Sequence, residues 1–175
     1  SWVHQTAADP DSAWVALERA FEELGERLPK ENARSAADTV LAAARRGVHR
    51  LRRTRPTSSP EVGLLCDLHY QNVRLGVEYG KPLRLVQSTL AVLELSELTG
   101  RSRVHARGLA IYGFILRAIR REAHGIARLA EAESIARSLG DPATEALCSQ
   151  LRAMGACWSG QLDEALVITR RVVGD

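Results

Sequence analysis

The feature that most constrains this chain is a 40-residue period in the positions where its helical patterns break. Breaks fall at residues 80–82, 120–122 and 160–162, with further turns at 99–100 and 139–140. One helix pair cannot bury its apolar faces, but stacked pairs can. The pattern therefore predicts an all-α fold, an αα-superhelix of stacked antiparallel helix pairs. Small or apolar residues fall into three columns at the same spacing: Val73, Gly113 and Ala153; Leu85, Gly125 and Ala165; Val92, Ala132 and Val172.

Three parts are predicted along the chain. Residues 1–56 form a helical pair, whose first helix runs from Asp11 to Leu28 and whose basic second helix runs from Asn32 to Arg53. Residues 57–60 form a linker, because prolines and hydroxyl residues oppose helix continuation. Residues 61–175 hold the repeats, divided as 61–100, 101–140 and 141–175.

Composition indicates a globular protein, with 45% apolar and 26% charged residues. The longest apolar stretch, residues 108–116, is shorter than the ~20 residues of a membrane span, and no signal peptide opens the chain. Cys66, Cys148 and Cys157 are an odd number without CxxC spacing, which favours reduced, buried thiols over disulfides or a zinc site. We therefore expect a cytoplasmic location, no metal and no cofactor.

Two turns carry a resemblance to a known family. The segment at 160–166, Gly-Gln-Leu-Asp-Glu-Ala-Leu, resembles the turn and second-helix start of a tetratricopeptide repeat (TPR). The segment at 138–142, Ser-Leu-Gly-Asp-Pro, is similar to the inter-repeat turn of the longer variant found in bacterial STAND-type signalling ATPases. Residues 80–84 and 48–56 also resemble the region between ATPase and repeats in that family. Such ATPases are often fused to nucleotide cyclase, Ser/Thr kinase or transcription-regulator domains.

The resemblance implies a TPR-like scaffold for signal transduction whose first helices bind a protein partner or other domains of the same chain. The sequence departs from the family where an aromatic is replaced by His69, Leu109 and Ser149, and where Arg120 replaces glycine. Transferred through the columns, the implied partner-binding residues are Asp67, Tyr70, Arg74, Arg107, Phe114, Arg117, Gln150, Met154 and Trp158. A competing interpretation places three of them, Phe114, Met154 and Trp158, in the core between repeats.

No catalytic motif is visible in the sequence. A phosphate-binding GxxxxGK[ST] loop is absent. Cys66 and His69 share a helix face and could pair as nucleophile and base, but no third group can be placed beside them. We therefore predict a segment without enzymatic activity of its own.

A basic run lies at the end of the second predicted helix and just after it, and it contains no acidic residue. This arginine run consists of Arg45, Arg46, His49, Arg50, Arg52, Arg53 and Arg55. It could contact phosphates, dock an acidic surface of another domain, or be a solvated face near a helix C-terminus. Domain docking by Arg45, Arg46, Arg50 and Arg53 is the functional role we favour, and nucleic acid is an unlikely partner because the net charge is only +3. The alternative function is an accessory domain of a DNA-binding transcriptional regulator that uses this helix.

Overall fold

The computed structural model describes residues 10–28, 59–100 and 102–173, and every regular element among them is an α-helix. The all-α prediction is confirmed. None of these helices is long and apolar enough to cross a membrane. The helices are α1 (Pro10–Glu23), α3 (Pro60–Glu78), α4 (Pro82–Thr99), α5 (Arg103–Ala118), α6 (Glu122–Ser138), α7 (Pro142–Trp158) and α8 (Leu162–Val173).

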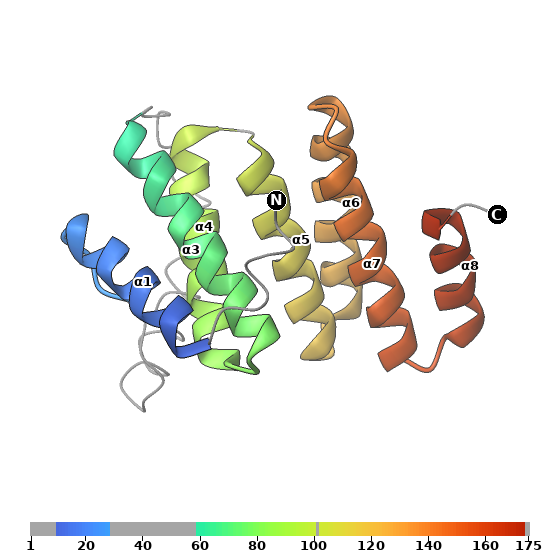
Figure 1. Cartoon of the computed structure of the whole chain (residues 1–175). Helices are drawn as coiled ribbons and strands as arrows, with labels where there is room; N and C mark the ends of the chain where they lie inside the picture. Colours follow the sequence, from blue (N-terminus) through green and yellow to red (C-terminus); the bar gives the residue numbers. More distant parts are fainter. Residues whose placement is uncertain (1–9, 29–58, 101, 174–175) are drawn as a thin grey trace.

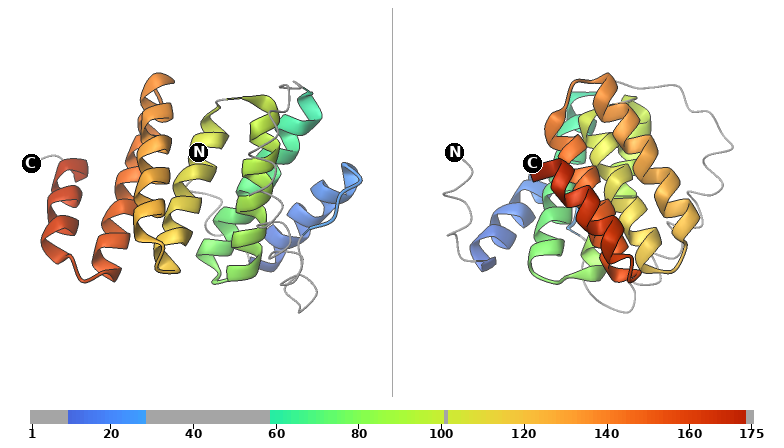
Figure 2. Two further views of the ribbon diagram at one scale, coloured as in Figure 1. Left: turned by 180° about the vertical axis from the view of Figure 1, so that it is seen from behind. Right: turned by 90° about the vertical axis from the view of Figure 1, so that its right-hand side faces the viewer.

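From α3 to α8 each helix packs against the next one along the chain, so the helices follow one another across the molecule in chain order (Figure 1). The first helix of each pair also contacts the first helix of the next pair: α3 contacts α5, and α5 contacts α7. Within the described residues, the second helices α4, α6 and α8 make no such contacts with one another. The first helices therefore lie closer to one another than the second helices do (Figure 2).

Five of the described helices, α1, α3, α5, α6 and α7, end in the same backbone motif. In α5, for example, the N–H of Arg121 donates to the carbonyl of Leu116 at 2.8 Å, the long-range bond of a Schellman C-cap. The residue before each such donor has positive φ, which suits glycine because it has no β-carbon. Among the described residues Arg120 is the one non-glycine with this conformation. The φ values are 72° at Gly25, 63° at Gly80, 64° at Arg120, 59° at Gly140 and 76° at Gly160.

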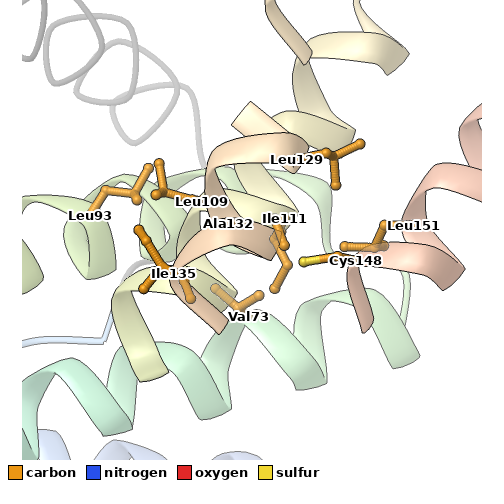
Figure 3. Packing of buried hydrophobic residues seen from close by; sticks show 11 residues of the cluster. Val73, Leu93, Leu109, Ile111, Leu129, Ala132, Ile135, Cys148 and Leu151 are labelled. Atoms are coloured by element: carbon orange, nitrogen blue, oxygen red, sulfur yellow. The ribbon is translucent and has the colours of Figure 1, made fainter. Parts of the chain in front are cut away.

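The main core lies where α3 to α7 meet, and Figure 3 shows its side chains converging from these helices. Leu93 and Leu129, from the second helices of two pairs, are fully buried beside Leu109 of α5. Gly113 and Ala165, two small residues of the 40-residue columns, are both buried. The apolar side chains of this core come from successive pairs, and their burial stabilises the stack.

The N-terminal helix is shorter than predicted. It begins at Pro10 and ends at Glu23 rather than at Leu28, because Gly25 takes a φ of 72° and closes a Schellman turn with Glu26. Leu28 is nevertheless buried, together with Leu17 and Phe21. The predicted second helix at 32–53, and with it the arginine run, lies outside the described residues.

Candidate partner-binding face

The candidate site is the surface presented by the three first helices, which we call the α3–α5–α7 face. Its exposed members are Asp67, Arg74, Gln150 and Trp158, and its half-buried members are Tyr70, Arg107 and Phe114. Because α5 contacts both α3 and α7, side chains from different repeats can meet here. The structure brings two predicted pairs together, one at each end of the face.

Arg107 links the three helices at one end. Its guanidinium carbon lies 5.6 Å from the ring centroid of Tyr70 on α3, within the range of a cation–π contact. On the other side its Nε donates to Thr144 Oγ1 at 2.9 Å, and its Nη2 lies 3.6 Å from Asp141 Oδ2. Arg107 is therefore held in one position, as a preformed recognition surface requires.

Asp141 anchors this cluster from the start of α7. It caps the helix by accepting the Thr144 N–H at 3.3 Å and the Thr144 hydroxyl at 2.6 Å. These bonds from Thr144, with the charges of Arg107 and Arg103, hold the pKa of the Asp141 carboxyl below its usual range. Asp141 and Thr144 were not among the site residues predicted from the sequence. An Asp-Pro helix start with threonine three residues after the aspartate is the capping signal that could have revealed them.

Phe114 and Trp158 meet at the other end, with ring centroids 4.8 Å apart and planes at 44°. Phe114 and Met154 pack against the main core, which agrees with the core interpretation for those two residues. Trp158 differs, because 65% of its surface remains exposed. A large aromatic side chain fixed on one side and open on the other has the features of a binding anchor.

Arg117 was predicted on the partner-binding face, and this prediction is wrong. Its side chain is 3% exposed, and its Nε donates to Glu122 Oε1 at 2.6 Å. Its Nη1 donates to the Arg152 carbonyl on α7 at 3.0 Å. Two glycines, Gly125 and Gly155, leave the space that this side chain fills. Arg117 thus joins α5, α6 and α7 from inside the stack and is not accessible to a partner.

Cys66 and His69 are not arranged as a nucleophile and its base. The thiol of Cys66 donates to the Val92 carbonyl at 3.6 Å, and burial raises the pKa of this thiol to about 12. His69 Nδ1 instead lies 3.3 Å from Ser88 Oγ, and burial lowers the pKa of the imidazole to about 4. The prediction that all three cysteines are buried is wrong for Cys157, which is exposed near the end of α7, while all three are free thiols.

The part of the chain that the structure describes contains no group of three or more histidine, cysteine or acidic residues that could hold a metal ion. No family model, curated protein or solved structure matches this chain.

Proposed function

We propose that this chain is a TPR-like helical-repeat segment that binds a protein partner, or another domain of its own protein, on the α3–α5–α7 face. Its parent would be a bacterial signalling ATPase of the STAND type, located in the cytoplasm, and the segment itself would act as a scaffold without catalysis. The observation that carries the proposal is the convergence of three first helices into one surface with ordered arginine and aromatic side chains.

Physical features of the face support binding of a protein segment. Arg107 and Tyr70 are already fixed by their neighbours, so little side-chain freedom is lost on binding. Trp158 and Arg74 remain exposed, and aromatic and arginine residues supply much of the energy at protein interfaces. Asp67 and Arg74 lie about two helical turns apart on α3 and carry opposite charges, which favours a partner segment of mixed charge over a polyanion.

Peptide display against the full chain tests the proposal. Peptides selected on the wild-type chain are measured again with Tyr70→Ala, Arg74→Glu and Trp158→Ala variants. We expect each variant to weaken binding by about tenfold or more, as hot-spot substitutions do. Ile126→Ser, on the exposed side of α6, is the matched control and should leave affinity unchanged. Peptides that bind the wild type and the three face variants equally would contradict the assignment of the face.

A further inference from the structure

A second surface of the chain lies beneath α1, on the side of α3 that carries Leu65, Leu68 and Leu75. Leu17 and Phe21 of α1 are buried against this surface, at 6% and 0% exposure. The Phe21 ring meets the His69 ring edge-on, with centroids 4.8 Å apart. The apolar side of α1 is thus seated on α3 as an amphipathic helix binds a receptor surface.

Trp14 covers the far end of the same surface. Its ring lies 6.5 Å from that of Tyr79, in an edge-on arrangement. Arg84, near the start of α4, places its guanidinium carbon 4.4 Å from the centroid of Trp14. We define the α1-docking surface as Leu65, Leu68, His69, Leu75, Tyr79 and Arg84.

The attachment of α1 differs from that of the helices that form the main core. Among the described helices α1 packs on α3 alone, apart from the Arg84 contact, whereas α4, α5, α6 and α7 each pack on at least two neighbours. The main core from α3 to α7 contains no residue of α1. Regions with few packing partners open at a lower free energy than the core, so α1 can leave without disrupting the stack.

Arg84 shows that α1 leaves one polar group of the docking surface without a hydrogen bond. Its Nε is buried and has no hydrogen-bond partner among the residues that the structure describes. Trp14 offers this guanidinium the face of a ring but no acceptor atom. A carboxylate at this place would accept the unmet N–H in a charge-assisted hydrogen bond.

From these observations we infer that the α1-docking surface is a binding site for an amphipathic helix from a partner protein. In the absence of the partner, α1 occupies this site, and we call α1 the resident helix. The partner helix presents apolar side chains to Leu65, Leu68 and Leu75, and a carboxylate to Arg84. Binding of the partner displaces α1. This surface is separate from the α3–α5–α7 face, so either assignment can fail without the other.

Exchange is tested with the full chain and a labelled peptide of residues 10–28 as the probe. Leu17→Ala with Phe21→Ala weakens the resident helix, and circular dichroism and thermal unfolding check that the stack is retained. We expect this chain to bind the peptide about tenfold or more tightly than the wild type, in which the resident competes at high effective concentration. Adding Leu68→Glu should abolish binding, whereas Leu64→Glu, at an exposed position of α3, should not. Absence of binding to the weakened, folded chain would overturn the inference.

The carboxylate requirement is tested by a double-mutant cycle. Peptides with Trp14→Glu and Trp14→Gln differ only in charge, and each is measured against weakened chains with Arg84 and with Arg84→Gln. We expect the Glu peptide to bind about fivefold more tightly than the Gln peptide when Arg84 is present, and equally when it is absent. Equal binding of the two peptides to the chain with Arg84 would refute the proposed carboxylate of the partner.

A dimer of the wild-type chain that Phe21→Ala dissociates would assign the site to a second copy of α1 and would also overturn the inference.

Discussion

Gly113 and Gly125 face each other across the α5–α6 contact so closely that a β-carbon on either would meet the carbonyl oxygen of the other. The two distances would be 2.8 Å and 2.6 Å. Since the obstructing atoms belong to the backbone, no side-chain rotation can relieve the clash. The approach of α5 to α6 therefore depends on both residues lacking a side chain.

Gly113→Ala should lower the free energy of unfolding by about 1–3 kcal/mol through overpacking. Gly63→Ala is the matched control, because Gly63 also lies within a helix but a β-carbon there would meet nothing within 4 Å. That substitution should raise stability by up to about 1 kcal/mol from helix propensity. Chemical denaturation of both variants measures the difference, and equal effects would contradict the close contact.

Arg120→Gly should stabilise the chain by about 0.5–1 kcal/mol. Arg120 has a φ of 64°, which costs about 1–2 kcal/mol for a residue with a β-carbon, and the flexibility of glycine in the unfolded chain offsets part of the gain. Arg121→Gly, one residue later at a φ of −97°, is the control and should destabilise. Thermal unfolding midpoints test the pair, and a lower midpoint for Arg120→Gly would contradict the proposed strain.

His69 should make the fold sensitive to mild acid. Burial lowers its pKa from 6.5 to about 4, so between these values the unfolded chain binds a proton that the folded chain excludes. Stability is present above pH 6.5 and is lost as the pH falls toward 4, by about 2 kcal/mol between pH 7 and pH 5. Denaturation of His69→Gln should show a smaller loss over this range than the wild type. His124→Gln, at an exposed position, should behave as the wild type does, and an identical pH dependence for all three chains would refute this role of His69.

The sequence pattern predicted the helices of the repeats well, because glycine with positive φ is a strong local signal. Gly80, Gly140 and Gly160 end helices where the period placed them. Arg120 has the same geometry without the same residue, and only the period indicated its turn.

The candidate site was less predictable, because its contacts join residues far apart in the chain. The burial of Arg117 depends on space left by Gly155, 38 positions away, and a lone arginine in sequence is normally assigned to the surface. The packing of Phe21 on His69 likewise has no local signal. The columns could place Tyr70 and Arg107 on first helices but could not show that Arg107 is fixed by Asp141 and Thr144.

The arginine run gives a prediction from sequence alone. We expect the chain to bind duplex or single-stranded DNA negligibly at physiological salt, because a net charge of +3 attracts a polyanion weakly. Fluorescence anisotropy across a salt series measures this, with Arg46→Glu, Arg50→Glu and Arg53→Glu combined as the control. Micromolar binding that falls steeply with salt and disappears in the triple variant would favour the DNA-binding regulator instead.

Amide hydrogen exchange of the full chain, with and without a peptide selected on the wild type, tests the central claim most directly. Binding to the α3–α5–α7 face should slow exchange in α3, α5 and α7, especially around Tyr70, Arg107 and Trp158, and leave α4, α6 and α8 unchanged. Slowed exchange confined to α4, α6 and α8 would contradict the account.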